Sequence, residues 1–299
     1  MPNDKRPILV FGATGRQGGS VAAALMKAQW PVRAIVRDAD ATAAADLADA
    51  GAELVRASLG DSGIIRSAME GAHGVFSVMP ANLSTEDEVR HGMSMADMAA
   101  DAGIEHFVYS SGASAGDKLT GVPRFDAKPR IEAHIRTLPL TATIVRPMIF
   151  MDMLVRPGFG LEEGRLISLV RPDQKMQLIA VEDIGKFVAA IFADRSGFAG
   201  TVLKIASDTL TGDQMGADFT EAAGRPITYS RFTDDSLAAN TDLAEMAKSM
   251  EDGPLSQHAD LFSLRRLNPE MRSLRDWLGG NGRKALDHAL AIDSKTKPG

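Results

Sequence analysis

The stretch Ile8-Leu-Val-Phe-Gly-Ala-Thr-Gly-Arg-Gln-Gly18 decides the fold of this chain. Its first four residues are apolar and β-prone, which predicts a short buried strand. From Val21 to Ala28, apolar residues recur every three to four positions, so a helix follows. Three glycines therefore separate a strand from a helix. Gly12 permits a tight turn, Gly15 lets the backbone approach a ligand, and Gly18 allows the helix and the strand to pack closely.

Short apolar runs alternate with helical periods through the first half of the chain, which is typical of βαβ units. After the first strand, Ile8 to Phe11, the sequence predicts five more: Val32 to Val36, Glu53 to Arg56, Gly74 to Val78, Phe107 to Tyr109 and Thr143 to Val145. The predicted fold is α/β, a doubly wound parallel sheet of the Rossmann type with six or more strands. The helix before the fifth strand should begin after Ser84, which resembles a capping box with Asp87, and should stop at Gly103.

The regular alternation fails from about Pro147, where prolines and glycines punctuate a run of loops. We therefore expect a Rossmann domain over residues 1–150 and a smaller α+β lobe over 151–299, with a helix around 182–193 packing back on the first domain. The smaller lobe should contain a strand from Thr201 to Ile205, a helix after Thr211 and a strand from Ile227 to Tyr229.

Composition excludes several classes of function. The formal net charge of -6 argues against nucleic acid as a partner. The chain has no cysteine, and its 6 histidines are scattered without metal-ligand spacing, so thiolate chemistry and a metal site are not expected. The N-terminus lacks signal-peptide features, and no stretch approaches the ~20 apolar residues that span a bilayer. We expect a cytoplasmic protein that does not bind membranes.

A glycine loop between a strand and a helix can hold a dinucleotide, because the helix N-terminus offers free N–H groups and a positive dipole to the phosphates. A tight βα turn without a ligand is the alternative. Arg37 ends the second strand, where NAD-binding folds place an acidic residue on the ribose, and an arginine there suits a 2′-phosphate. These residues favour NADP(H), with Arg16 as a second positive group. Alternatively, Arg37 is an exposed arginine beside Asp38.

The spacing Gly12-Ala-Thr-Gly-Arg-Gln-Gly18 resembles that of the NmrA-like family of atypical short-chain dehydrogenases. The resemblance covers nearly the whole chain. It continues through Val36-Arg37, Val75-Phe-Ser-Val78, Phe107-Val-Tyr-Ser-Ser111, Val145-Arg-Pro147 with Phe150, Val181-Glu-Asp-Ile184, Leu267-Asn-Pro269 and Asp276-Trp-Leu278.

The resemblance implies an NADP(H) site whose residues come from several elements. It assigns Thr14, Gly15, Arg16 and Gln17 to the pyrophosphate, Leu59 to the adenine, Met79 to the central ribose, and Pro147, Met148, Ile149 and Phe150 to the nicotinamide. For the last four residues, a strand that leaves the sheet into a turn is an equal alternative. The family includes redox-sensing regulators and reductases of quinone or isoflavone type.

The catalytic pattern of short-chain dehydrogenases is incomplete here. Lys128 matches the family lysine, but Arg124 stands where the tyrosine acid would be, and an arginine does not release a proton near neutral pH. Lys128 shares a helical stripe with Ile131 and Ile135, which turns it toward the protein, so we expect it to contact the cofactor; an exposed lysine paired with Glu132 at i, i+4 is the alternative. A serine at the end of the fifth strand, with Ser111 preferred, could bond a substrate carbonyl or simply close the strand.

Two functions follow from these observations. The first is an NADPH-dependent reductase of a small carbonyl, quinone or enone held between the lobes, assisted by Lys128 and Ser111. The second is a non-catalytic sensor in which NADP(H) occupancy changes the surface offered to a protein partner. The sequence favours the enzyme, since water or Lys128 could supply the proton.

Overall fold

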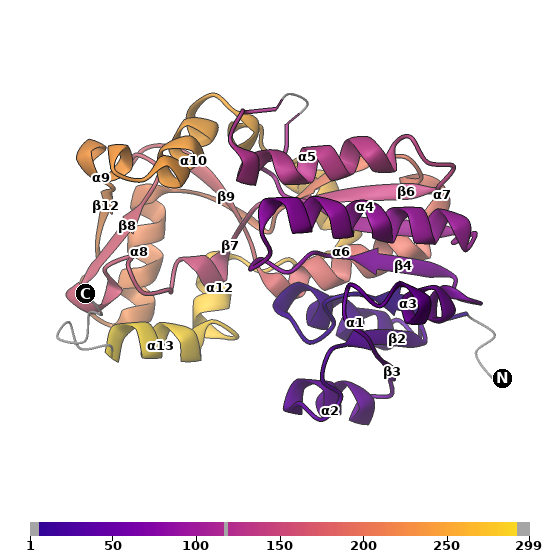
Figure 1. The fold of residues 1–299 in the computed structure, drawn as a ribbon. Coiled ribbons are helices and arrows are strands. Elements are labelled where there is room, and N and C mark those ends of the chain that lie inside the picture. Colours follow the sequence, from indigo (N-terminus) through magenta and orange to yellow (C-terminus); the bar gives the residue numbers. More distant parts are fainter. Residues whose placement is uncertain (1–5, 117–118, 292–299) are drawn as a thin grey trace. The chain divides into compact units, whose positions relative to one another are not determined.

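A computed structural model describes residues 6–116 and 119–291 of the chain (Figure 1). The described residues form two compact units. The first lies within the ranges Met1–Pro147 and Glu182–Lys204, and the second within Met148–Val181 and Ile205–Gly299. The first unit contains the glycine loop and almost all of the larger sheet.

The larger sheet is a parallel sheet of 7 strands in the order β10-β6-β5-β4-β1-β2-β3. Its strands are β1 (Ile8–Val10), β2 (Val32–Val36), β3 (Glu53–Arg56), β4 (Gly74–Ser77), β5 (His106–Ser110), β6 (Ala142–Pro147) and β10 (Val202–Ile205). All six strands expected from the sequence are present, so the doubly wound parallel fold is confirmed. The order reverses at β1, between β4 and β2, directly beside the glycine loop.

The seventh strand corrects the expectation that residues 201–205 belong to the smaller lobe. β10 instead lies beside β6 at the edge of the large sheet. The Ile144 N–H donates to the Thr201 carbonyl at 2.9 Å, and the Met148 N–H donates to the Ile205 carbonyl at 2.9 Å. A short apolar run fits either sheet equally well, so its pattern could not assign this strand.

Helices cover both faces of this sheet (Figure 1). They are α1 (Arg16–Lys27), α2 (Thr42–Asp49), α3 (Ser62–Met69), α4 (Thr85–Asp101), α5 (Pro123–Ile135), α6 (Val181–Ala193) and the short α7 (Arg195–Phe198). One core joins buried side chains of α3, α4 and α5 to β-strand residues such as Phe11, Phe107 and Tyr109. On the opposite face, the ring of Phe192 from α6 meets His106 of β5 edge-on, with centroids 5.3 Å apart.

Two glycines allow α6 to pack closely in the first unit. A Cβ atom on Gly74 of β4 would lie 2.5 Å from Phe192 Cε1, and one on Gly185 of α6 would lie 2.2 Å from the Ser20 carbonyl oxygen of α1. The backbone N–H of Gly185 also donates to Ser20 Oγ at 3.2 Å. Helices α1 and α6 are therefore neighbours at a distance that only glycine permits.

The start and the end of α4 follow the sequence signals. Ser84 is the N-cap, and its Oγ accepts a hydrogen bond from the Asp87 N–H at 3.1 Å. The Asp87 carboxylate in turn accepts from Ser84 Oγ, not from the N-cap backbone, because the aspartate side chain is too short for a full capping box. Gly103, with φ of 65°, follows the last turn.

The second unit has two small sheets. One contains β11 (Asp208–Thr211), β9 (Lys175–Ile179) and β7 (Ile149–Phe150), and the other pairs β12 (Thr228–Arg231) with β8 (Arg165–Ser168). Three 3-10 helices, η1 (Met151–Met153), η2 (Leu161–Glu163) and η3 (Pro254–Ser256), accompany them. The α-helices are α8 (Gly212–Ala223), α9 (Asp234–Ala238), α10 (Thr241–Glu251), α11 (Leu261–Leu267), α12 (Leu274–Gly279) and α13 (Arg283–Ala291). The expected helix after Thr211 and strand near Tyr229 are present.

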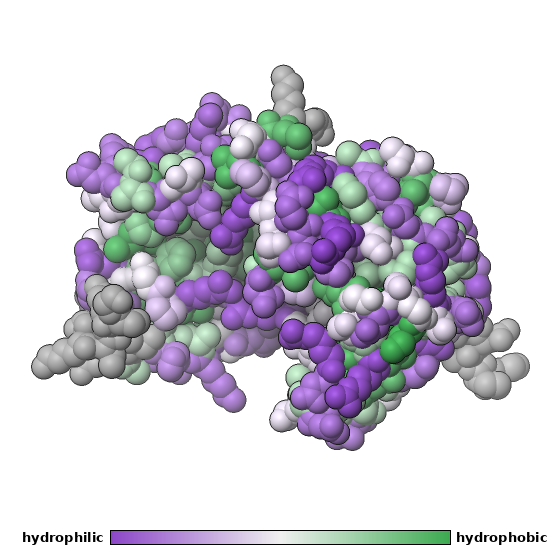
Figure 2. All heavy atoms as spheres, in the orientation of Figure 1, coloured by the Kyte–Doolittle hydropathy of each residue, from purple (hydrophilic) through white to green (hydrophobic). Residues whose placement is uncertain are grey.

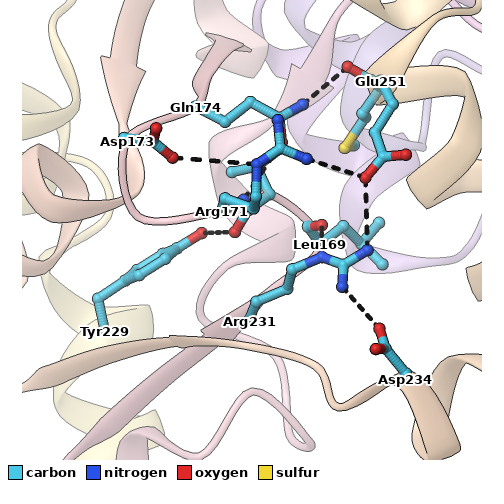
Figure 3. A network of polar contacts seen from close by, with 10 residues as sticks. Leu169, Arg171, Asp173, Gln174, Tyr229, Arg231, Asp234 and Glu251 are labelled. Carbon is cyan, nitrogen blue, oxygen red and sulfur yellow. Dashed lines mark hydrogen bonds and ion pairs between the residues drawn. The ribbon is translucent and has the colours of Figure 1, made fainter.

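A polar network holds α10 to the strands of the second unit (Figure 3). The Glu251 carboxylate lies 3.1 Å from a guanidinium nitrogen of Arg171 and 3.6 Å from one of Arg231. The side-chain amide of Gln174 donates to the Met250 carbonyl at 2.8 Å. The Tyr229 hydroxyl donates to the Val170 carbonyl at 2.7 Å, and burial raises the pKa of Tyr229 to about 12. These contacts fix the end of α10 against the loop between β8 and β9.

Hydrophilic side chains predominate on the face drawn in Figure 2, with smaller apolar areas between them. Four large apolar residues stand out as exposed in the described chain, and they lie on separate segments: Ile64, Leu119, Val202 and Phe262. Between residues 6 and 291, leaving aside 117 and 118, no helix is both long enough and apolar enough to cross a membrane.

Candidate functional site

The glycine loop is closed by contacts that leave no room for side chains. Gly12 has φ of 66°, and a Cβ atom there would lie 2.9 Å from Val78 Cγ1. The Gly15 N–H donates to the Gly12 carbonyl at 2.8 Å, which makes the turn. A Cβ atom on Gly18 would lie 2.2 Å from the same carbonyl oxygen. The tight turn predicted at Gly12 and the close packing predicted at Gly18 are confirmed, and the role of Gly15 stays a prediction.

The N-terminus of α1 is open. Gly15 is its N-cap residue, and no side chain caps the helix. The first N–H groups of an uncapped helix need a partner, and a phosphate group is a suitable one. Thr14, Gly15 and Arg16 are exposed around this end, whereas Gln17 is half-buried. This uncapped helix end lies where the resemblance assigns the pyrophosphate, and that assignment stays a prediction.

Arg37 follows β2 directly and is exposed. Asp38 does not pair with it, because the Asp38 carboxylate accepts a hydrogen bond from the Asp40 N–H at 3.0 Å. Within the described residues Arg37 makes no hydrogen bond or ion pair, and the same is true of Arg56, which ends the adjacent strand β3. The end of β2 thus carries a guanidinium group that is not used by the fold.

Leu59 and Met79, which the resemblance assigns to the adenine and ribose, follow β3 and β4. Leu59 is half-buried and packs against the core cluster that includes Ile65 of α3. Met79 is 6% exposed. Val78, the residue before Met79, is the one that contacts Gly12. The structure therefore brings the end of β4 to the glycine loop.

Ser110 and Ser111, at the end of β5, point to opposite faces of the sheet. Ser110 Oγ donates to Gln17 Oε1 of α1 at 2.7 Å, while Ser111 Oγ donates to Glu132 Oε1 of α5 at 2.6 Å. Ser111 is 5% exposed. Its proton is thus engaged within the fold, and its catalytic role stays a prediction.

The partner of Ser111 is a buried carboxylate with several cationic neighbours. Arg146 of β6 donates to both oxygens of Glu132, at 2.9 and 2.6 Å, and Arg136 donates to one at 2.9 Å. Burial by itself would raise the pKa of Glu132, but the hydrogen bonds from Arg146 and Ser111 outweigh it and hold that pKa below its usual value. Glu132 is therefore an ionised, structural group that ties β5, β6 and α5 together.

Lys128 is paired with a residue that the sequence analysis missed. Its Nζ lies 2.7 Å from Glu88 Oε1, in the first turns of α4, and not on Glu132, so the i, i+4 alternative is wrong. The Lys128 Cδ lies 3.5 Å from where a Cβ atom on Gly112 would stand. Ile131 and Ile135 are buried as expected, while the lysine remains 29% exposed. No spacing links positions 88 and 128; only the packing of α4 on α5 brings them together.

A tyrosine acid is not available at the end of β5. Arg124 lies one turn before Lys128 on α5 and is exposed. Tyr109 lies inside β5, as expected, and its buried hydroxyl has no hydrogen-bond partner in the described chain. Burial, with Glu88 and Glu132 nearby, raises the pKa of Tyr109 well above its usual value. Neither residue can supply a proton to a substrate near neutral pH.

The four residues assigned to the nicotinamide fall into both units. Pro147 ends β6, and its carbonyl accepts from the Ala113 N–H at 3.1 Å. In the second unit Met148 is 3% exposed, and Ile149 and Phe150 form β7, which pairs with Leu178 and Ile179 of β9. The chain thus leaves the large sheet after Pro147 and continues as a short strand of a small sheet, and the nicotinamide role of these residues stays a prediction.

Comparisons with known proteins agree with this fold. Residues 4–269 match the NmrA-like family. The NmrA-like family domain-containing oxidoreductase hkm9 of Aspergillus hancockii is 32% identical over 258 residues, which cover 77% of this chain and 76% of that protein.

Two solved structures share the fold. NmrA, a negative transcriptional regulator in complex with NADP, superposes with a TM-score of 0.76 at 23% identity, covering 96% of this chain and 98% of that one. The NADPH-dependent quinone oxidoreductase QOR2 of Escherichia coli, complexed with NADPH, gives 0.76 at 23% identity, covering 91% and 98%. At these identities the likeness extends to the fold alone.

Proposed function

Because this chain belongs to the NmrA-like family, we propose that it is an NADPH-dependent reductase of a small carbonyl, quinone or enone. The observation that carries the proposal is the uncapped N-terminus of α1 behind a loop closed by Gly12 and Gly18, together with an unpaired Arg37. Relatives described as oxidoreductases, and a quinone oxidoreductase with the same fold, support the reductase over a simple binding module.

The choice of NADP(H) over NAD(H) rests on charge at the end of β2. The 2′-phosphate is the group that distinguishes the two cofactors, and a planar guanidinium with free donors binds it well. The Arg37 side chain makes no hydrogen bond or ion pair within the described residues, so its donors are available to a ligand. An acidic residue at this place would instead favour the free ribose hydroxyls of NAD(H).

The reaction needs few groups from the protein. When bound, the reduced cofactor supplies a hydride to the substrate carbon or ring. The substrate oxygen then requires a proton from water or from Lys128. The Glu88 carboxylate, 2.7 Å from Lys128 Nζ, holds the lysine side chain in place, so Lys128 would orient the substrate oxygen while the proton comes from water or from Lys128 itself.

The test is NADPH oxidation by the purified protein with a panel of quinones, enones and aldehydes. At least one class should be reduced with turnover. The Lys128→Met variant should lose at least about tenfold in kcat/KM. Lys27→Met, which removes an exposed lysine at the end of α1, is the matched control. Tight NADPH binding without turnover on any member of the panel would contradict the reductase.

A redox sensor is the second candidate, favoured by Arg124 in place of the tyrosine acid. Such a protein would bind a regulatory partner in only one state of its cofactor, since a ligand shifts an equilibrium only by its differential affinity. Association with a partner that changes between NADPH and NADP⁺, in the absence of turnover, would support the sensor. Equal affinities for both cofactor states, with no change in association, would count against it.

A further inference from the structure

Ser110 and Gln17 are 93 positions apart in the sequence, and their side chains form a hydrogen bond of 2.7 Å. Ser110 is fully buried at the end of β5, whereas Gln17 is a half-buried residue in the first turn of α1. The bond therefore joins the carboxyl end of β5 to the glycine loop. No motif marks this pair, because its members lie on separate elements.

The bond uses only one end of the Gln17 amide. Ser110 Oγ donates to Oε1, so the Nε2 group points away from the serine. Within the described residues Nε2 donates to no acceptor. A half-buried amide that is anchored at its oxygen presents two N–H donors in a fixed direction, beside the open N-terminus of α1.

We propose that Ser110 is a positioning residue for cofactor binding, which holds the Gln17 amide so that Nε2 donates to an oxygen of the bound nucleotide. This inference rests on the proposed function, since it needs a nucleotide in the glycine loop. Without Ser110 the amide could rotate and offer its oxygen to the phosphates, which repel it. The bond from Ser110 Oγ stabilises the orientation in which Oε1 faces the serine and Nε2 faces the glycine loop.

The role differs from that of neighbouring Ser111, whose bond to Glu132 belongs to a network closed within the fold. The Gln17 Nε2 is not among the buried unpartnered atoms of the described chain, so it is open to solvent and is able to donate to a ligand.

The experiment measures the NADPH dissociation constant and the melting temperature of the full chain and its variants. Ser110→Ala should weaken NADPH binding by roughly threefold to tenfold. Gln17→Glu keeps an acceptor for Ser110 but replaces the donors by a charge, and it should weaken binding by more than about tenfold. Ser77→Ala is the matched control, because Ser77 is also buried, on adjacent β4, and its hydroxyl has no partner in the described chain.

A second background separates positioning from structure. In the Gln17→Leu variant, Ser110→Ala should no longer change NADPH affinity, because the amide that it positions is gone. The inference would be overturned if Ser110→Ala bound NADPH as tightly as the wild type. It would also be overturned if Ser110→Ala lowered the NADPH affinity equally in the wild-type and Gln17→Leu backgrounds. If the wild-type protein binds no NADPH, the proposed function fails first, and that result is visible before any variant is compared.

Discussion

At the scale of single residues, the contacts of a side chain decide how far its role can be inferred from the sequence, as Arg37 and Lys128 show. Arg37 follows β2 directly, and its side chain makes no hydrogen bond or ion pair within the described residues. Its position in the sequence is therefore enough to suggest its role. The position of Lys128 does not reveal its partner, which is the Glu88 carboxylate of α4 at 2.7 Å. The ion pair with Glu88 fixes where the Lys128 side chain lies.

Replacing Arg37 tests the cofactor preference. Arg37→Ala should weaken NADPH binding by about 10-fold to 100-fold, because charge-assisted bonds to the 2′-phosphate are lost, and should leave NADH binding nearly unchanged. Isothermal titration of both cofactors would measure this. Arg56→Ala, which removes an equally unpaired arginine from the end of β3, is the control. A similar loss for both cofactors, or a larger loss in Arg56→Ala, would remove Arg37 from its assigned role.

At the scale of elements, the end of β5 organises the first unit. Its two serines reach α1 on one face of the sheet and α5 on the other. Glu132 extends the second connection to β6 through Arg146. The alternation of side chains along a strand makes this possible, because adjacent residues must face opposite sides.

The Glu132 network has a measurable effect on stability. Glu132→Ala leaves the buried Arg146 without its carboxylate and should lower the free energy of unfolding by about 3 kcal/mol or more. Glu86→Ala breaks only the exposed pair between α4 and Arg130 and should cost less than about 1 kcal/mol. Urea denaturation of both variants gives the comparison. Equal stabilities would mean that the buried network contributes no more than a surface pair.

Local sequence patterns predict these elements well and their tertiary partners poorly. The six strands, the Ser84 cap and the glycine turn each depend on a few adjacent residues. β10 was assigned to the wrong sheet, because an apolar run shows that a strand is buried and not which neighbour pairs with it. The contacts between Lys128 and Glu88 and between Ser110 and Gln17 join separate elements of the fold. The spacing of residues along the sequence does not predict such contacts.

At the scale of the whole molecule, one buried histidine links stability to pH. His106 is fully buried in β5, and its Nε2 lies 2.8 Å from Thr143 Oγ1. Burial, with smaller effects of Arg195 and His73, lowers the pKa of His106 to about 4. The folded state therefore prefers the neutral ring, whereas the unfolded chain takes up a proton near pH 6.5.

The sign of the pH dependence follows from this difference. The stabilisation is complete above pH 6.5 and is lost progressively as the pH falls toward about 4, by roughly 3 kcal/mol in total. His106→Gln should show a shallower decline of the unfolding free energy over this range than the wild type, measured by urea denaturation at a series of pH values. His288→Gln, at an exposed position on α13, is the control. Parallel curves for His106→Gln and the wild type would contradict the assignment.

The proposed function requires a nucleotide in the glycine loop. A preference for NADPH over NADH requires, in addition, that the protein binds the 2′-phosphate. Direct titration of the purified wild-type chain with the two reduced cofactors tests this most plainly. The structure leads us to expect one NADPH per chain, bound at least about tenfold more tightly than NADH. Absence of NADPH binding, or NADH bound as tightly as NADPH, would contradict it.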